Sequence, residues 1–331
     1  MTLFLAPEDI TRLATHEVAM AAAMAAAMAE GSGRAVAPPR LDVELSGGFL
    51  RVMPGAVDDV MGLKVMVNVA GLGNRYLLLV YRRGDGELLA LLDADEITRL
   101  RTAATTAVAA QILQPEPQSE IGLIGSGFEA TGHLRTLAQI WPLERVSVHS
   151  PSAERREAFA EQLSEELGIE VRPVATSAEA CMASATLVLA TKSRQPVLDG
   201  RDLPAGSVVL SIGSTRPDLR ELDRATLARS AVLLVDDAAQ VTLESGDVMD
   251  ALSSNALAPR HLISMGSALA AGQRLLPDGE RDVLTFKSVG TAVQDLALAG
   301  ALCAAAVDLD VGRELGVLTR LKPFAAVVEP R

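Results

Sequence analysis

The sequence has little of what marks a secreted, disulfide-stabilised or metal-binding protein. Its 331 residues include two cysteines, Cys181 and Cys303, which lie far apart and have no neighbouring cysteine. Isolated thiols of this kind are typical of reduced, buried cysteines in a cytoplasmic protein. The four histidines form no pair at metal-ligand spacing, so we expect no metal site.

Long apolar runs and blocks of positive charge are also missing. The best candidate for a membrane span, residues 18–29, is bounded by Glu17 and Glu30 and is shorter than the ~18 residues that a span needs. No basic region followed by a long apolar stretch opens the chain, so we expect no signal peptide and a cytoplasmic location. The net charge is −12 without any Lys/Arg-rich block, which argues against a nucleic-acid partner.

The first third of the sequence predicts a helix followed by a meander of short strands. Tight turns at Gly47-Gly48 and at Gly84-Asp85-Gly86 separate β-rich runs, which is typical of an antiparallel sheet. Asp93 and Glu96 then resemble a capping box at the start of a helix that continues to about residue 113.

From residue 115 to about 290 the pattern changes to an alternation of strands and helices. The candidate strands are 120–124, 145–149, 171–175, 186–191, 207–213, 231–236 and 284–288. Helical patterns at 152–167 and 222–229 lie between them. This alternation indicates a parallel, doubly wound sheet.

The length of the chain suits two domains. We predict an α/β protein in which residues 114–298 form a Rossmann-type dinucleotide-binding domain with a doubly wound parallel sheet. A last helical pattern, residues 290–307, should carry the chain back to the first domain. Residues 1–113 plus 299–331 would then form an α+β substrate-binding domain with an antiparallel sheet.

The most informative motif is the glycine-rich segment that follows the strand at 120–124. In its Gly-x-Gly-x-x-Ala pattern, Gly125 permits a tight turn, Gly127 lets the backbone approach a pyrophosphate, and Ala130 keeps the helix close to its strand. The free N–H groups of the helix N-terminus point at the phosphates. The expected phosphate-binding residues are therefore Gly125, Ser126, Gly127, Phe128, Glu129 and Ala130.

The end of the next strand bears on the choice of cofactor. An acid there would bind the ribose 2′-hydroxyl of NAD, but the sequence has His149-Ser150-Pro151-Ser152, followed by Arg155 and Arg156. Hydroxyls and a guanidinium suit a 2′-phosphate better, so we favour NADP(H) over NAD(H), with His149, Ser150, Ser152 and Arg155 near the cofactor. The alternative is that both arginines are solvated helix residues.

Two charged residues stand in apolar surroundings in the first domain. In the helix after Asp93, Arg101 lies within the apolar stripe, whereas Arg99 points the opposite way. Arg101 could clamp a carboxylate bidentately or form an internal salt bridge to a structural acid. Lys64 sits in the apolar run 61–67, where desolvation would lower its pKa and suit proton transfer; a lysine at a strand edge is the alternative.

Short motifs follow one another in a fixed order along the chain. They are Pro39-Arg40, Met53-Pro54, Gly62-Leu63-Lys64-Val65, Leu100-Arg101-Thr102-Ala103-Ala104, Gly125-Ser126-Gly127-Phe128-Glu129-Ala130, Gln195-Pro196-Val197-Leu198, Gly213-Ser214-Thr215-Arg216-Pro217-Asp218-Leu219-Arg220-Glu221-Leu222, Glu244-Ser245-Gly246-Asp247 and Phe286-Lys287-Ser288-Val289-Gly290. Together they resemble the ornithine cyclodeaminase/μ-crystallin family over nearly the whole length.

The resemblance implies a homodimer assembled through the first domain, which binds NAD(P)(H) in the second. It implies that Arg40, Lys64 and Arg101 surround the carboxylate of the substrate and its α-carbon or imine. Ala190-Thr191 and Ser288-Val289 would lie near the nicotinamide. The chemistry of the family is hydride transfer between the nicotinamide and the α-carbon of an amino or imino acid.

Two positions depart from the family pattern. The dinucleotide motif usually has Gln where this chain has Glu129, which affects details of the phosphate contact. True cyclodeaminases carry an aspartate and a lysine in the loop that follows Gly213, where our alignment places Thr215 and Leu219. Because threonine cannot act as the base for ring closure, cyclodeamination is disfavoured.

We therefore expect an NAD(P)(H)-dependent oxidoreductase, either an imino-acid or ketimine reductase or an amino-acid dehydrogenase. Arg40 and Arg101 would hold the carboxylate, and Lys64 would protonate or polarise the imine nitrogen. Cyclic imines such as pyrroline- or piperideine-2-carboxylate are the expected small substrates.

Two alternatives stay open at this stage. One is ornithine cyclodeaminase proper, which forms proline and ammonia. The other is a μ-crystallin-like protein that binds NADPH and a ligand with little catalysis; the low aromatic content of 3% offers such a ligand few stacking partners. Asp236, Asp237 and Asp295 suit either the cleft or helix capping, and the sequence does not decide between these roles.

Overall fold

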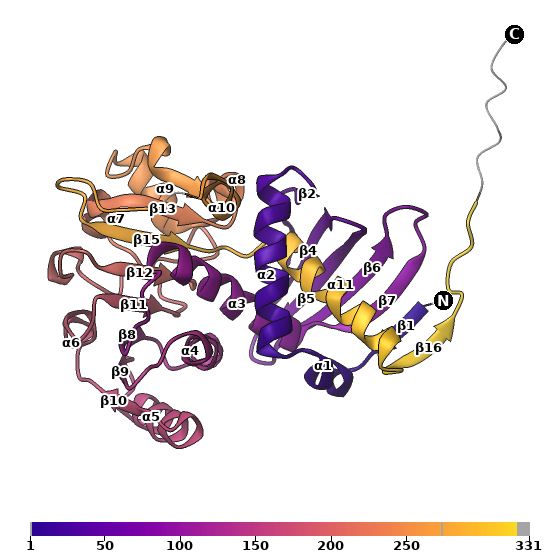
Figure 1. The fold of residues 1–331 in the computed structure, drawn as a ribbon, viewed down its shortest axis with the longest axis horizontal. Helices are drawn as coiled ribbons and strands as arrows, with labels where there is room; N and C mark the ends of the chain where they lie inside the picture. The colour runs from indigo at the N-terminus through magenta and orange to yellow at the C-terminus, as the bar shows by residue number, and fades with distance from the viewer. Residues whose placement is uncertain (1, 273, 323–331) are drawn as a thin grey trace, which may run out of the picture.

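The computed structural model describes residues 2–272 and 274–322, and within these ranges two eight-stranded sheets lie next to each other (Figure 1). One sheet is mixed and the other is entirely parallel. The predicted class, an α/β protein with a doubly wound parallel sheet and a second, α+β part, is confirmed. None of the helices in the described ranges has the length and hydropathy needed to cross a membrane.

The mixed sheet has the strand order β16-β1-β7-β6-β5-β4-β2, with β3 paired to β4. Its strands are β1 (Thr2–Leu5), β2 (Ala35–Val36), β3 (Leu41–Leu45), β4 (Gly48–Val57), β5 (Val60–Val69), β6 (Gly73–Arg82), β7 (Leu88–Asp93) and β16 (Arg313–Gly316). Strands β3 to β7 form the expected antiparallel meander. The chain opens with strand β1, not with a helix, and β1 runs parallel to β7.

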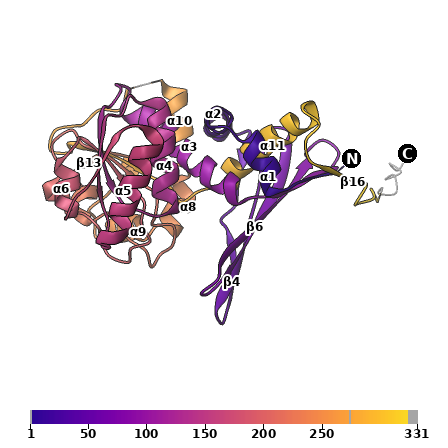
Figure 2. The same ribbon diagram turned by 90° about the horizontal axis from the view of Figure 1, so that it is seen from below.

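Helices cover one face of the mixed sheet, as the edge-on view in Figure 2 shows. They are α1 (Pro7–Leu13), α2 (His16–Gly31) and α11 (Ala292–Asp308). Gly55 of β4 and Gly62 of β5 are paired across the sheet. A Cβ atom at Gly55 would lie 3.0 Å from the Cβ atom of Ala292 of α11, and one at Gly62 would lie 3.0 Å from Leu296 of α11 and would collide with the carbonyl oxygen of Leu79. The two glycines therefore allow α11 to lie close to the sheet.

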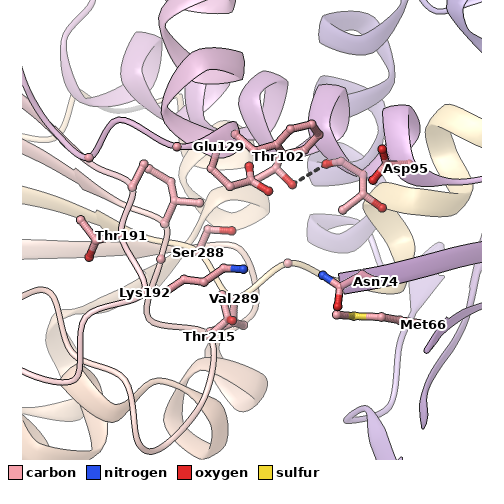
Figure 3. A pocket seen from close by; sticks show the side chains of 18 of the residues that line it. Met66, Asn74, Asp95, Thr102, Glu129, Thr191, Lys192, Thr215, Ser288 and Val289 are labelled. Atoms are coloured by element: carbon pink, nitrogen blue, oxygen red, sulfur yellow. Dashed lines mark hydrogen bonds between the residues drawn. The ribbon is translucent and has the colours of Figure 1, made fainter. Parts of the chain in front are cut away.

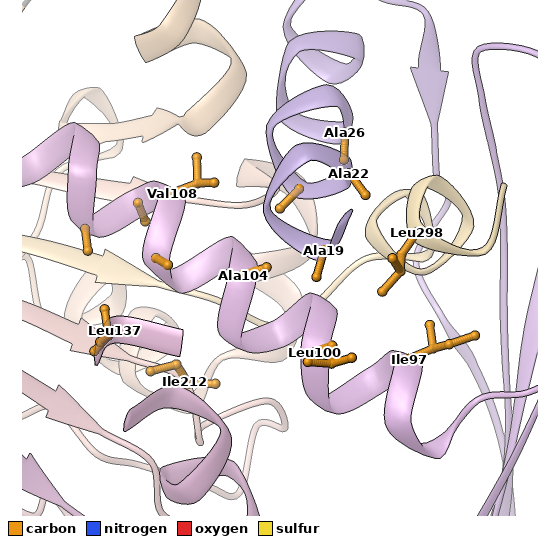
Figure 4. Close-up of a cluster of buried hydrophobic side chains, with 14 of the residues drawn as sticks. Ala19, Ala22, Ala26, Ile97, Leu100, Ala104, Val108, Leu137, Ile212 and Leu298 are labelled. Carbon is orange, nitrogen blue, oxygen red and sulfur yellow. The ribbon is translucent and has the colours of Figure 1, made fainter. Parts of the chain in front are cut away.

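Small side chains form the core where α2, α11 and helix α3 (Asp95–Leu113) meet. Ala19, Ala22 and Ala26 of α2 and Ala104 of α3 all belong to this buried cluster (Figure 4). Alanine faces let helix axes approach closely, and α2 and α3 are in contact along this face. Because interiors are densely packed, a larger side chain here would cost about 1–3 kcal/mol.

The parallel sheet has the order β10-β9-β8-β11-β12-β15-β13-β14. Its strands are β8 (Glu120–Ile124), β9 (Arg145–His149), β10 (Glu170–Pro173), β11 (Thr186–Leu189), β12 (Val208–Ser211), β13 (Ser230–Val235), β14 (Leu262–Ser264) and β15 (Val283–Lys287). The chain runs from β8 outward through β9 and β10, and then returns to β11 on the other side of β8. The ligand crevice of such a sheet lies at this switch point, outside the carboxyl ends of the strands.

The helices of this second part connect its strands. They are α4 (Phe128–Ile140), α5 (Ala153–Leu167), α6 (Ser177–Met182), α7 (Arg224–Arg229), α8 (Ala238–Glu244), α9 (Gly246–Ser253) and α10 (Met265–Ala271), with short 3₁₀ turns η1 (Gly200–Asp202) and η2 (Pro259–His261). Strand β14 and helices α8 to α10 were not predicted. Each of these elements is short, and the sequence between residues 238 and 271 shows no sustained helical or strand periodicity.

The start of α3 differs from the sequence prediction, whereas the domain boundaries remain a prediction. The capping box at Asp93 and Glu96 is wrong: α3 begins at Asp95, its N-cap Ala94 makes no side-chain cap bond, and Glu96 pairs with Arg99 one turn on. The division into 1–113 plus 299–331 and 114–298 stays a prediction, and its residues 323–331 lie outside the described ranges.

Candidate active site

A cleft of about 820 Å³ opens between the two sheets. Strands of the mixed sheet and the first turns of α3 form one wall. The carboxyl ends of the parallel strands and the start of α4 form the other, as Figure 3 shows with Asn74 and Met66 opposite Thr191 and Val289. All three candidate catalytic residues, and all but two of the candidate cofactor-binding residues, line this cleft.

The glycine-rich segment has the geometry of a phosphate-binding turn. Gly125 has a φ of +125°, and a Cβ atom there would collide with the carbonyl group of Ala190. Gly127 is the N-cap of α4 and makes no side-chain cap bond, so the first N–H groups of this helix are available to a ligand. The space beside Gly127 is open. Ala130 does not line the cleft but is fully buried behind it, as expected for the residue that lets the helix pack.

The residues that follow β9 bring hydroxyl groups and one arginine to the cleft. Ser126 donates a hydrogen bond to the Oγ atom of Ser150 at 2.8 Å, and Ser152 caps α5 by accepting from the N–H of Arg155 at 3.3 Å. The guanidinium of Arg155 lines the cleft and has no ion-pair or hydrogen-bond partner within the described ranges. Arg156, in contrast, donates to the carbonyl of Ser150 at 3.0 Å.

His149 lies at the end of β9 outside the cleft lining. Its Nδ1 atom is 3.3 Å from the carbonyl oxygen of Val174. The structure therefore places Ser150, Ser152 and Arg155 together at the cleft but leaves His149 behind them.

On the opposite wall, one buried carboxylate joins two candidate catalytic residues. Asp295 of α11 forms an ion pair with Lys64 of β5, with Nζ 2.7 Å from Oδ2, and accepts a hydrogen bond from Arg101 of α3, with Nε 2.9 Å from Oδ1. Arg101 also donates through Nη1 to the Oε1 atom of Gln294 at 2.9 Å. All three charged groups are at least nine-tenths buried. Of the two readings of Arg101, the internal salt bridge is therefore present, and it forms at the edge of the cleft.

The surroundings of Lys64 suit a proton-transfer group. Burial lowers the pKa of Lys64 to about 8, and the neighbouring Asp295 only partly opposes this shift. The Nζ atom lies 3.4 Å from the hydroxyl of Thr98 and 5.9 Å from the ring centre of Tyr76. An ammonium with a pKa near 8 carries its proton at neutral pH and can still release it.

Arg40 lies where the two walls meet. Its Nη2 atom donates to the carbonyl oxygens of Val289 and Gly290, both at 2.8 Å, and lies 2.6 Å from Oε2 of Glu244. Within the described ranges, its Nε atom is buried without a hydrogen-bond partner. An unpaired buried donor is costly, so this N–H is free to bind an acidic ligand group.

A second buried carboxylate holds the segment that Arg40 contacts. Asp236 accepts from the hydroxyl of Ser288 at 2.7 Å and from the N–H groups of Val289 and Gly290. Asp237 instead caps α8 by accepting from the N–H of Gln240 at 2.7 Å. The three acids that the sequence left undecided thus divide: Asp236 and Asp295 are buried and hold residues that line the cleft, and Asp237 is a helix cap.

Several cleft residues were not predicted. Arg51 lines the cleft and makes a bidentate pair with Asp42, at 2.7 and 2.6 Å. Lys192 follows Thr191 and extends toward Val289 and Thr215 in Figure 3. Neither Arg51 nor Lys192 carries a sequence signal that could have found it.

The two departures from the family pattern also have clear positions. Glu129 faces the cleft, its Oε2 atom has no partner within the described ranges, and burial raises the pKa of its carboxyl. Thr215 lines the cleft, whereas Leu219 is buried elsewhere. Within the described part of the chain, no group of three or more His, Cys, Asp or Glu side chains could hold a metal ion.

Known protein families include one that matches nearly the whole of this chain. A family model described as the ornithine cyclodeaminase/mu-crystallin family matches residues 1–308. The chain belongs to the ornithine cyclodeaminase/mu-crystallin family. The resemblance noted from the sequence motifs is thereby confirmed.

Curated members and one solved structure of the family extend over most of the chain. A Delta(1)-pyrroline-2-carboxylate/Delta(1)-piperideine-2-carboxylate reductase of Azospirillum brasilense is 32% identical, covering 90% of this chain and 93% of its own. Ketimine reductase mu-crystallin of Mus musculus is 30% identical over 76% of this chain and 79% of its own. The structure of Thermococcus litoralis Delta(1)-pyrroline-2-carboxylate reductase, in complex with NADH and L-proline, superposes with a TM-score of 0.88 at 28% identity, covering 95% of this chain and all of that one.

The residues present fit a nicotinamide dinucleotide. The uncapped N-terminus of α4 and the open space at Gly127 suit a pyrophosphate. One end of the cleft has the hydroxyls of Ser150 and Ser152 and the guanidinium-bearing Arg155, and the other end reaches the Lys64–Asp295–Arg101 group. A dinucleotide and a small acid can therefore lie end to end in one cleft.

Proposed function

We propose that this protein is a nicotinamide-dependent reductase of small cyclic imino acids, which acts at the α-carbon next to the carboxylate. One observation carries the proposal: the buried Lys64–Asp295–Arg101 group lies in the same cleft as the glycine-rich start of α4. A cation that can release a proton and a guanidinium that can bind a carboxylate are the groups that an imino acid requires. The family membership supports the same chemistry.

The nicotinamide, when bound, supplies or accepts the hydride. We propose that NADP(H) is favoured over NAD(H), because Arg155 and the hydroxyls of Ser150 and Ser152 suit a 2′-phosphate and no acid stands at that position. Gly125 would form the turn, and Ser126 to Ala130 would hold the pyrophosphate through backbone N–H groups. Ala190, Thr191, Ser288 and Val289 would border the nicotinamide end.

The chain's own residues would then bind, orient and protonate the substrate. Arg40 would use its unpaired Nε–H, and Arg101 its remaining Nη2 group, to hold the carboxylate. Lys64 would donate its proton to the imine nitrogen in reduction and accept it in oxidation. Asp295 would keep both cations in place and supply the compensating charge when no substrate is bound.

Ring closure of a diamino acid is not favoured by this site. Thr215 lines the cleft at the position where the family's cyclodeaminases carry an aspartate, and a threonine hydroxyl cannot serve as a base near neutral pH. We therefore rank reduction of a preformed cyclic imine, or dehydrogenation of an amino acid, above conversion of ornithine to proline and ammonia.

We further propose a homodimer that assembles through the mixed sheet. Apolar side chains of neighbouring strands are exposed there, among them Leu41, Val43, Leu45, Val67 and Val69. A group of this kind on one sheet face marks an interaction site. Sedimentation velocity tests the assignment, which a monomer at micromolar concentration would contradict.

A cytoplasmic location remains our expectation from the cysteine content.

The proposed activity is tested by following NADPH and NADH oxidation with pyrroline-2-carboxylate and piperideine-2-carboxylate, beside NAD⁺ reduction with ornithine. We expect oxidation with at least one cyclic imine and a faster rate with NADPH. Turnover of ornithine alone would replace the proposal with cyclodeamination. Tight cofactor binding without any turnover would favour a binding protein.

A further inference from the structure

A buried group of charges that the proposed function does not use lies directly beneath the nicotinamide end of the cleft. It consists of Glu221, which follows the loop after β12, Lys287 at the end of β15, and Asp247 in the first turn of α9. Glu221 and Lys287 are fully buried and Asp247 is 2% exposed. Charged groups are rarely placed in an interior unless they are fully partnered.

Glu221 accepts a hydrogen bond from four donors. One oxygen, Oε1, accepts from the N–H of Thr191 at 2.6 Å and from its hydroxyl at 2.9 Å. The other, Oε2, accepts from the hydroxyl of Ser211 at 2.7 Å and from the N–H of Gly213 at 2.7 Å. Because all four partners donate, the side chain acts as an ionised carboxylate that binds two separate loops at once.

Lys287 and Asp247 hold that carboxylate in place. The Nζ atom of Lys287 donates to the hydroxyl of Ser211 at 2.9 Å and lies 3.7 Å from Glu221 and 3.4 Å from Asp247. Asp247 accepts from the backbone N–H of Glu221 at 2.8 Å. Burial raises the pKa of Glu221, and Lys287 is the main opposing charge. The ammonium of Lys287 therefore offsets part of the cost of burying this carboxylate.

The two loops that Glu221 joins both border the cleft. Thr191 follows β11 and Gly213 follows β12, and both line the cavity. Their packing leaves no spare room, because a Cβ atom on Gly213 would collide with the carbonyl of Thr191 and with Glu221 itself. A change in the length or charge of the Glu221 side chain must move at least one of these loops.

We propose that Glu221 is a positioning residue for hydride transfer, which fixes Thr191 and Gly213 as a rigid seat for the nicotinamide half of the cofactor. Lys287 and Asp247 act through Glu221 and do not touch the ligand. The inference rests on the proposed function for the location of the nicotinamide. It goes beyond that function by separating the residues that order the nicotinamide from those that hold the phosphates.

The test compares the affinity of the whole cofactor with that of a fragment that lacks the nicotinamide. For wild type and E221Q, dissociation constants are measured by calorimetry for whichever of NADPH and NADH binds, and for the corresponding 2′-phospho-ADP-ribose or ADP-ribose. Glutamine keeps the shape of Glu221 but presents an NH₂ group to one pair of donors. We expect E221Q to bind the fragment like wild type and to lose most of the additional affinity that the nicotinamide provides.

Two further variants keep this test decisive. S211A removes one of the four hydrogen bonds, and the acceptor of Lys287 with it, but leaves the Glu221 side chain itself unaltered. It should therefore show the same loss in a smaller degree even if E221Q does not fold. D282N breaks the Arg229–Asp282 pair, with bonds of 2.8 and 2.7 Å, just before β15 begins. It should lower the melting temperature and leave the ratio of cofactor to fragment affinity unchanged. The proposal would be overturned if E221Q and S211A both keep the wild-type ratio of cofactor affinity to fragment affinity, whether both affinities are unchanged or both fall equally.

A kinetic measurement adds the catalytic consequence. In single-turnover reduction of a cyclic imine, E221Q should slow hydride transfer on the order of 100-fold, the effect expected of a displacement of about 1 Å, and should raise the primary isotope effect with C4-deuterated cofactor. A wild-type isotope effect in E221Q would contradict a positioning role. If wild type reduces no imine at all, the proposed function fails, whereas the binding comparison still decides the role of Glu221.

Discussion

The wall of the cleft on the parallel sheet offers mostly backbone, whereas the wall on the mixed sheet offers charged side chains. On the first wall, the start of α4 offers its first N–H groups, and the space beside Gly127 is open. On the second, Lys64, Arg101 and Asp295 come from β5, α3 and α11 and meet only through the fold. A backbone site can be coded by one short motif, but a side-chain site requires several distant segments to be placed correctly.

The difference also separates binding from chemistry. Glycine substitutions on the first wall should alter cofactor affinity. Substitutions of the charged group on the second wall should alter turnover or stability and leave cofactor affinity nearly intact. The variants below test this division, from the largest expected effect to the smallest.

Replacing the buried lysine should have the largest effect. We expect K64M to lower the reductive kcat by about 10²- to 10⁴-fold, the usual contribution of a general acid, while the dissociation constant for the cofactor stays close to wild type. Stopped-flow absorbance at 340 nm (the nicotinamide band) and a binding titration measure the two quantities. K192M, which changes the exposed lysine of the same cleft, should lose far less turnover. Equal losses in the two variants would contradict the assigned role of Lys64.

Removing the shared carboxylate should have the largest effect on stability. D295N leaves Lys64 and Arg101 buried without their anion, so the free energy of unfolding should fall by about 3–5 kcal/mol. Urea unfolding followed by circular dichroism measures it. The matched variant D95N changes a carboxylate that lines the cleft and forms no ion pair with any residue of 2–272 or 274–322. It should stay within about 0.5 kcal/mol of wild type. A stable D295N protein would mean that the three groups are not coupled as described.

The two glycines of the phosphate-binding segment should respond differently. G125A forces a left-handed φ on alanine and pushes its Cβ against the carbonyl of Ala190, so it should lose about 1–3 kcal/mol of stability as well as cofactor binding. G127A meets open space and should fold like wild type but bind the cofactor more weakly. Thermal unfolding and cofactor titration separate these effects. Wild-type affinity in G127A would show that no ligand approaches that position.

The smallest effect concerns the 2′-phosphate. R155Q should weaken NADPH binding by about 10-fold, the value of one charge-assisted hydrogen bond, and should leave NADH binding unchanged. R156Q is the control, because Arg156 is already engaged with the carbonyl of Ser150. Fluorescence titration with both cofactors distinguishes the variants. If R155Q and wild type discriminate equally between NADPH and NADH, the cofactor preference has another origin.

The sequence predicted the features that are local in the chain. The glycine-rich turn, the alternation of strands and helices, and the meander between residues 41 and 93 each depend on neighbours, and the structure has all of them. The burial of Lys64 and Arg101 followed from single polar residues in apolar patterns. That reasoning could not choose between a substrate clamp and an internal ion pair, because the choice depends on which acid the fold brings close.

The features that the sequence did not predict depend on distant contacts. Asp295 lies 194 positions from Arg101, and Glu221 joins Thr191 and Gly213 only after β11 and β12 have paired. Strand β1 was missed because four residues beside a helix carry no clear alternation. The capping box failed because the N-cap is Ala94, one residue later than the motif suggested.

The most direct test of the account is the pH dependence of NADPH oxidation with a cyclic imino acid. Lys64 must be protonated to act in reduction, and its pKa is lowered to about 8. We therefore predict a rate that is constant below pH 7 and falls as the pH rises through about 8, with the opposite trend for oxidation of the amino acid. A reductive rate that is unchanged up to pH 10, or that rises with pH, would contradict the central role of Lys64.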